Sequence, residues 1–106
     1  MRKSSIPKHQ RAGAGSPLSV AIGRELRRRR LAGGLTQAAL GDPLTRGYVS
    51  AVERGNAVPS IPALALFTDR LGIALDEFFG GVNEQMTTVY SRAHGNGEDP
   101  TSRRRR

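Results

Sequence analysis

The chain has 106 residues, a formal net charge of +8 and no cysteine. Its length has room for one domain and little else, and the absence of cysteine excludes disulfide bonds and thiolate metal sites. The apolar stretches are far shorter than the ~20 residues that a membrane-spanning helix needs. The charged start of the chain has no apolar segment behind it, so we expect no signal peptide and a cytosolic protein.

The excess positive charge lies at the two ends of the chain. Residues 1–17 carry four basic residues and no acid, and residues 91–106 carry five arginines against two acids. Residues 18–90 carry eight arginines against seven acids. Both ends are rich in small and polar residues and cannot bury enough apolar surface to offset ordering. We therefore expect disorder over 1–16 and 91–106, where the charge either seeks phosphates or only keeps the protein soluble.

The first ordered element is expected at residues 17–32. Ser16 followed by Pro17 is typical of a helix start, with a capping hydroxyl and a proline in the first turn. Leu18, Ile22 and Leu26 recur at every fourth position and predict one apolar stripe. The glycine pair at 33–34 supplies the stop.

Two short helices are expected next. Thr36 caps a helix that contains residues 38–40, and the run Gly41-Asp42-Pro43 breaks it. The following helix starts at Leu44 or Thr45 and runs to residue 54, where Gly55 ends it. Its two faces differ. The apolar face, which predicts contact with the core, is Tyr48, Val49 and Val52; the face left for a partner is Arg46, Gly47, Ser50 and Arg54.

The last predicted elements begin at Ser60, which caps a fourth helix with Pro62 in its first turn. Gly72 ends that helix, and residues 75–79 predict a short fifth one. Beyond the glycines at 80–81, residues 86–90 are strand-like, so 82–90 is an edge strand, a partner-binding segment or a helical extension. On the fourth helix the predicted inward residues are Ile61, Leu64, Phe67 and Leu71. The predicted core is Ile22, Leu26, Leu40, Val49, Val52, Leu64, Phe67 and Leu71.

Together these motifs resemble the Cro/C1-type (XRE family) helix-turn-helix domain over residues 18–80. The matching pieces are Ile22-Gly23-x-x-Leu26-Arg27-x-x-Arg30, Gly34-Leu35-Thr36-Gln37, Tyr48 to Gly55, Pro59-Ser60 and Leu71-Gly72-Ile73-x-Leu75-Asp76-Glu77-Phe78-Phe79. The resemblance implies an all-α, five-helix, lambda-repressor-like DNA-binding domain at 17–81. Around it we expect a basic N-terminal arm at 1–16, a short extension at 82–90 and an Arg-rich tail at 91–106.

The resemblance also implies which residues contact DNA. The second helix of such a motif lies in the major groove and its N-terminal residues meet the bases, so residues 44–54 form the recognition helix. The expected base contacts are Thr45, Arg46, Gly47 and Ser50. A guanidinium can bond both O6 and N7 of guanine, although Arg46 on a phosphate is an equally good interpretation.

The expected phosphate contacts are Gln37, Arg54 and Asn56, of which Gln37 and Asn56 rest on the resemblance. The resemblance also pairs Arg30 with Glu53 in a structural ion pair. The span from Gln37 to Tyr48 is about two residues shorter than the family pattern and contains Pro43, so the helix before it must end early.

An enzyme is not expected. Both histidines, His9 and His94, lie in the basic ends, and no carboxylate pair, phosphate loop or nucleophile–base set is visible. We expect no cofactor and no metal site. Double-stranded DNA is the expected partner, bound by a homodimer at the nucleoid. The alternative is an antitoxin or adaptor whose main partner is a protein, such as a toxin, because Leu66, Phe79, Val82, Met86 and Val89 form apolar surface.

Overall fold

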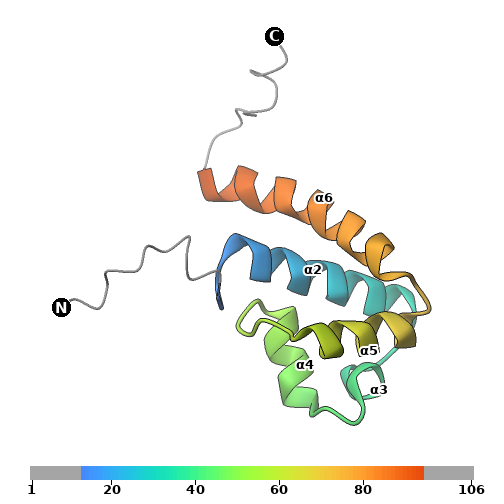
Figure 1. Ribbon diagram of the computed structural model, residues 1–106. Coiled ribbons are helices and arrows are strands. Elements are labelled where there is room, and N and C mark those ends of the chain that lie inside the picture. The colour runs from blue at the N-terminus through green and yellow to red at the C-terminus, as the bar shows by residue number, and fades with distance from the viewer. Residues whose placement is uncertain (1–12, 95–106) are drawn as a thin grey trace, which may run out of the picture.

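The structure, a computed structural model, describes residues 13–94, which form five helices and no strand (Figure 1). The helices are α2 (Pro17–Ala32), α3 (Gln37–Gly41), α4 (Arg46–Glu53), α5 (Ile61–Leu71) and α6 (Leu75–His94). The fold is therefore all-α, as predicted. None of these helices combines the length and apolar character needed to cross a membrane.

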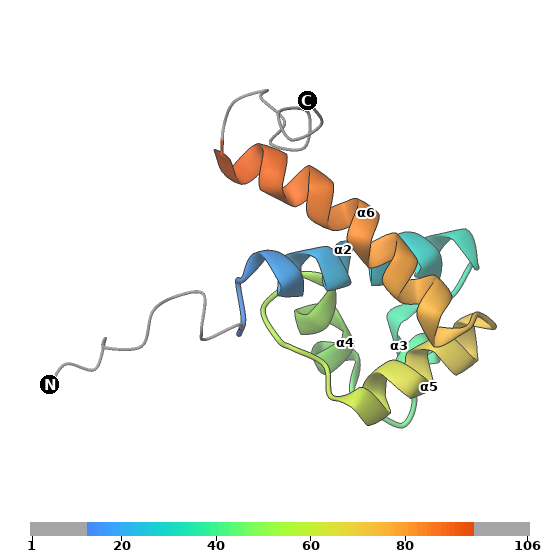
Figure 2. The same cartoon turned by 45° about the horizontal axis from the view of Figure 1, so that its top comes forward.

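Helix α2 is the central element of the domain. It contacts α6 on one side and α4 on the other, while α3 packs against α4 and α5. Figure 1 shows α6 on one side of α2 and the group α3–α5 on the opposite side, and Figure 2 shows α6 passing across α2. The molecule thus has an α6 side and an α3–α4 side that share one helix.

Three helix starts agree with the predicted caps at Ser16, Thr36 and Ser60, and Thr45 caps α4 in the same way. Each capping hydroxyl accepts a hydrogen bond from a backbone N–H three residues later, which satisfies one of the free donors of the first turn. The pairs are Ser16 with Ser19 at 3.1 Å, Thr36 with Ala39 at 3.0 Å, Thr45 with Tyr48 at 3.0 Å and Ser60 with Ala63 at 3.1 Å.

The core contains seven of the eight residues predicted for it, and Leu71 is only half-buried. The inward assignment of Ile61 was wrong, and Leu18 of the predicted apolar stripe is also exposed. Ile61 is 67% exposed and Leu18 is 43% exposed. Both residues lie in the first turn of their helix. Phe78, Val82 and Val89 complete the core from α6, so the prediction of Val82 and Val89 as part of an apolar surface was wrong.

The fifth helix is longer than the predicted 75–79, and of the three alternatives for 82–90 the structure shows the helical extension. Residues 75–94 form one continuous helix, α6, through both glycines. Tertiary packing overrides local propensity here, because Phe78, Val82 and Val89 are buried against α2. Gly81 faces the carboxylate of Glu25, and a Cβ at Gly81 would lie 2.0 Å from Glu25 Oε2.

The predicted disorder is wrong at its inner edges. Gly15 N donates to Gly55 O at 2.7 Å, which ties the segment before α2 to the end of α4. At the other end, residues 91–94 belong to α6. The rest of both predicted disordered ends, 1–12 and 95–106, lies outside the described residues.

Candidate nucleic-acid interface

Helix α4 has one buried and one exposed face, as its sequence predicted. Val49 and Val52 are fully buried and Tyr48 is half-buried. The backbone of α4 also approaches α2 very closely, since a Cβ on Gly23 would lie 2.4 Å from Val52 O. Only a glycine fits at that crossing, and the crossing fixes α4 on the central helix.

The N-terminal end of α4 carries the predicted base-contact residues. Thr45, Arg46 and Gly47 are all exposed. Arg46 forms no hydrogen bond or ion pair with any residue between 13 and 94, and the position of a Cβ on Gly47 is open space. An exposed cation without a protein partner is able to bind a base edge or a phosphate without first breaking a contact.

Two of the predicted DNA-contacting residues, in the C-terminal half of α4 and at its end, form a hydrogen bond with each other. The Arg54 guanidinium donates a hydrogen bond to the Ser50 hydroxyl. This pair holds both side chains on the exposed side of the helix. Asn56 follows just past the helix end, exposed, with its backbone N–H bonded to Ala51 O at 2.9 Å.

Glu53 is the buried anion of this side of the molecule. Arg30 Nε donates to its Oε2 at 2.6 Å, and Arg30 Nη2 donates to its Oε1 at 3.0 Å. Gln37 Nε2 donates to the same Oε1 at 3.0 Å, and Arg30 Nη1 donates to Leu35 O at 2.9 Å. The structure therefore brings together the three residues Arg30, Gln37 and Glu53, and through them the helices α2, α3 and α4.

Arg27 joins this cluster, although the sequence analysis did not single it out. Its Nη1 lies 4.0 Å from Glu53 Oε1, and its side chain is 58% exposed. Glu53 thus links the exposed Arg27 to the half-buried Gln37 at the start of α3. The sequence spacing could have predicted this contact with Glu53, because Arg27 precedes Arg30 by three residues and lies on the same helix face.

The turn between α3 and α4 is short and closely packed. A Cβ on Gly41 would lie 2.3 Å from Val49 Cγ2, so α3 ends directly against α4. Leu44 N donates to Gly41 O at 2.6 Å across the turn. The Asp42–Pro43 peptide bond is cis. Helix α3 spans only five residues, in agreement with the early end that the short spacing predicts.

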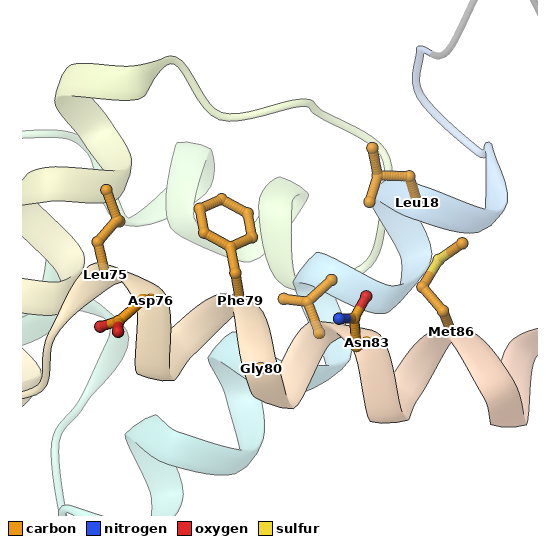
Figure 3. A pocket seen from close by; sticks show the side chains of 8 residues that line it. Leu18, Leu75, Asp76, Phe79, Gly80, Asn83 and Met86 are labelled. Atoms are coloured by element: carbon orange, nitrogen blue, oxygen red, sulfur yellow. The ribbon is translucent and has the colours of Figure 1, made fainter.

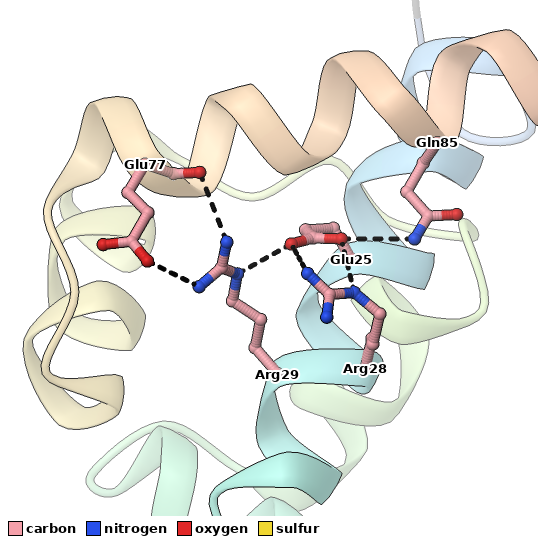
Figure 4. A network of polar contacts seen from close by, with 5 residues as sticks. All are labelled: Glu25, Arg28, Arg29, Glu77 and Gln85. Atoms are coloured by element: carbon pink, nitrogen blue, oxygen red, sulfur yellow. Dashed lines mark hydrogen bonds and ion pairs between the residues drawn. The ribbon is translucent and has the colours of Figure 1, made fainter.

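The α6 side of α2 carries a second buried carboxylate, Glu25, which is 1% exposed (Figure 4). It accepts two hydrogen bonds from Arg28, at 3.0 and 2.7 Å, one from Arg29 at 2.7 Å and one from Gln85 at 3.2 Å. Burial raises the pKa of Glu25, but these hydrogen bonds outweigh it and hold the pKa below its ordinary value. Arg29 also reaches Glu77, with Nη1 at 3.1 Å from Oε2.

An apolar groove lies between the start of α2 and α6 (Figure 3). Its walls include Leu18, Leu75, Phe79 and Met86, and the first three side chains are 36–43% exposed. Figure 3 shows Phe79 and Leu75 rising from the same face of α6 toward the space beside Leu18. This groove is on the opposite side of α2 from α3 and α4.

The sequence profile of the helix-turn-helix domain family matches residues 21–78. That match spans more than half of the chain and includes both α3 and α4. The chain belongs to the helix-turn-helix family. Members of this family and fold are typically not enzymes.

Solved structures with the same arrangement are also regulators. The clp gene regulator ClgR from C. glutamicum is 30% identical with a TM-score of 0.61, over 65% of this chain and 92% of its own. Two variants of the restriction-modification controller protein C.Esp1396I are 26% and 29% identical, each with a TM-score of 0.61, over 67% of this chain and 97% of their own. No curated protein matches the chain. The resemblance to XRE-type regulators is confirmed, and these findings support DNA-binding transcription regulation.

Proposed function

We propose that this helix-turn-helix chain binds double-stranded DNA in a sequence-specific way and acts as a small transcription regulator, with α4 in the major groove. The observation that carries the proposal is the two-sided character of α4. Its inner face is fixed by buried Val49 and Val52, while its N-terminal end presents Thr45, Arg46 and Gly47 to the outside. In helix-turn-helix complexes it is this end of the second helix that meets base edges.

The residues of α4 have different roles in the proposal. Arg46 reads guanine, because its guanidinium is exposed and has no partner among residues 13–94. Gly47 lets the helix backbone approach the DNA closely, since nothing lies within 4 Å of a Cβ there. Thr45 and Ser50 supply hydroxyl groups at the edges of the contact, which discriminate less between bases.

The phosphate contacts surround this surface. Gln37 lies at the start of α3, and Arg54 and Asn56 lie at the end of α4. We add Arg27, whose exposed guanidinium neighbours Glu53 on the same carboxylate oxygen that Gln37 uses. Contacts of this kind set the register of the protein on the duplex.

The experiment that tests the proposal is a selection from random duplex DNA with the full chain, followed by binding of Arg46→Ala to the selected site. Loss of a bidentate guanine contact costs ~1–3 kcal/mol and relaxes preference at one base pair. Arg28→Ala is the matched control, since it removes an equal charge on the α6 side. Equal loss of affinity by Arg46→Ala on every sequence makes Arg46 a phosphate contact. No preferred duplex at low salt contradicts the function.

We propose a homodimer as the DNA-bound form. One copy offers few base-reading residues, and Gly47 has no side chain, so a second copy supplies affinity and length of site. Two copies of this motif place their half-sites ~34–36 Å apart on a palindrome. The groove of Leu18, Leu75, Phe79 and Met86 is the surface assigned to the second copy. Sedimentation that gives a monomer both free and on DNA contradicts this assignment.

The same groove is the observation that favours a second candidate function, an antitoxin or adaptor bound mainly to another protein. The two candidates differ in what a groove substitution does. Phe79→Ser weakens DNA binding through the dimer in the first case. In the second case the wild-type chain shows no preferred duplex, and Phe79→Ser affects only a protein partner.

We further propose that the basic ends act as phosphate-seeking arms. Residues 1–17 and 91–106 together hold nine of the seventeen basic residues. Each phosphate contact steepens the log–log salt dependence of binding by ~0.9. A chain without residues 1–12 and 95–106 is expected to bind all sequences more weakly with a flatter slope and an unchanged ranking of sites. An unchanged slope contradicts the proposal.

A further inference from the structure

Arg70, in the last turn of α5, reaches across to the segment that joins α3 to α4. Its Nη1 donates to Ala39 O at 2.9 Å, and its Nη2 donates to Asp42 O at 2.6 Å. One guanidinium thus binds two backbone carbonyls on either side of the end of α3. Neither acceptor is a side chain, so the contact fixes the path of the chain itself.

Ala39 O belongs to the last turn of α3 and Asp42 O to its C-cap, and both residues are exposed. The last four carbonyls of a helix have no intrahelical donor, and α3 has only five residues. The backbone bonds at its end are Asp42 N to Ala38 O at 3.1 Å and Leu44 N to Gly41 O at 2.6 Å. Neither of these bonds uses Ala39 O or Asp42 O, and a cation near a helix C-terminus is also favoured by the helix dipole.

The position of this turn determines the position of α4. Asp42 is three residues before Thr45, the N-cap of α4, and Gly41 lies against Val49 with no room for a Cβ. A displacement of the turn therefore moves the exposed end of α4, where Arg46 and Gly47 lie. Contact between α3 and α5 keeps Arg70 beside the turn.

We propose that Arg70 is a positioning residue for DNA recognition. Its hydrogen bonds to Ala39 O and Asp42 O fix the orientation in which α4 enters the major groove of DNA. The inference rests on the proposed function. It does not give Arg70 a contact with DNA. Arginine is required because its planar fork places two N–H donors at a fixed spacing. A lysine ammonium keeps the charge without that geometry.

The experiment compares full-length wild type with Arg70→Lys and Arg70→Ala on the selected duplex, on the duplex with one base pair changed under α4, and on random-sequence duplex. Arg28→Lys is the control for exchange of arginine for lysine, since it lies on the α6 side. Each variant is measured over a range of salt concentrations, and its melting temperature is recorded.

We expect Arg70→Lys to bind random duplex with the wild-type affinity and salt slope. Its preference for the selected duplex is expected to fall about threefold to tenfold, the equivalent of one or two hydrogen bonds. Arg70→Ala is expected to lose at least as much preference, and Arg28→Lys to lose none. The amide of Leu44 is expected to exchange faster in Arg70→Lys than in wild type, which reports on the turn without DNA.

Two results overturn the inference. A uniform loss on all duplexes in Arg70→Ala, with a salt slope lower by about 0.9 and full rescue by lysine, makes Arg70 a phosphate contact. An unchanged preference in Arg70→Lys makes the contact a cap without effect on recognition. If Arg70→Ala does not fold, Arg70→Lys decides. If the wild-type chain has no preferred duplex, the proposed function itself is wrong. If the wild type has a preferred duplex and only the Arg70 variants behave against expectation, the inference about Arg70 alone is wrong.

Discussion

Arginines of α2 donate hydrogen bonds to two buried carboxylates, one on each side of the helix. The surroundings of the two carboxylates differ. Glu53, on the α3–α4 side, depends on the paired hydrogen bonds of Arg30 and on Gln37. Glu25, on the α6 side, shares its hydrogen bonds among Arg28, Arg29 and Gln85. Each carboxylate accepts two hydrogen bonds from one arginine, but that arginine side chain is 9% exposed beside Glu53 and 56% exposed beside Glu25.

The two sides also differ in what they leave for a ligand. On the α6 side the arginines are paired with Glu25 and Glu77 (Figure 4), and the open surface is the apolar groove. On the α3–α4 side, Arg46 has no partner among the described residues and Arg27 is 58% exposed. An anionic ligand is therefore favoured on the α3–α4 side and an apolar one on the α6 side.

The largest expected effect comes from breaking the common core beneath α4. Val52→Asp buries an unpaired charge at a fully buried position, which costs more than about 4 kcal/mol and unfolds the domain. Gly47→Asp places the same side chain on the exposed face of the same helix and leaves the fold intact. Circular dichroism melting compares them, and a wild-type melting temperature for Val52→Asp would sink the core assignment.

The next effect tests the difference between the two carboxylates. Arg30→Met leaves buried Glu53 without its main partner and is expected to cost about 3–5 kcal/mol. Arg28→Met removes a side chain that is 56% exposed from a carboxylate that keeps Arg29, so the expected cost is below about 1 kcal/mol. Urea denaturation measures both. Equal losses would show that the two clusters are held alike.

A smaller effect distinguishes the adjacent glycines of α6. Gly81→Ala places a Cβ 2.0 Å from Glu25 Oε2 and is expected to destabilise the domain by about 1–3 kcal/mol. Gly80→Ala meets nothing within 4 Å and is expected to stabilise it by about 0.5–1 kcal/mol. Thermal melting gives the sign of each change. The same sign for both would mean that α6 does not pack on Glu25 as described.

The smallest effect is a dependence on pH. The pKa of Glu25 is lower in the folded chain than its ordinary value, so the unfolded chain takes up the proton first as the pH falls. The stabilisation is complete above about pH 4.5 and is lost as the pH falls through the folded pKa. Unfolding free energies of wild type and Glu25→Gln, measured from pH 7 to pH 3, check this. The variant is expected to vary less, and identical profiles would exclude the contribution.

Much of the fold is predictable from the sequence because its helix starts are encoded locally. Ser16, Thr36, Thr45 and Ser60 each cap a helix through a bond within three residues. Helix α6 was not predictable in this way. Its glycines at 80–81 and its β-branched residues at 87–89 disfavour a helix locally, and the packing of Phe78 and Val82 on α2 that overrides them is a long-range contact.

The candidate site also has features that the sequence predicts and features that depend on long-range contacts. The exposed end of α4 followed from helix periodicity, and the pairing of Arg30 with Glu53 followed from the family resemblance. The bond from Gln37 to Glu53 and the reach of Arg70 to two carbonyls were not predictable. They join residues 16 to 31 positions apart, and nothing in the local pattern of either partner indicates the other.

The most direct test of the account is a map of backbone amide NMR shifts when the full chain binds its selected duplex. The account predicts the largest changes at residues 37–56, which include α3, the turn and α4, and little change around Glu25 and Gln85. Large changes along α6 with α4 unaffected would contradict it, because they would place the ligand on the opposite side of α2.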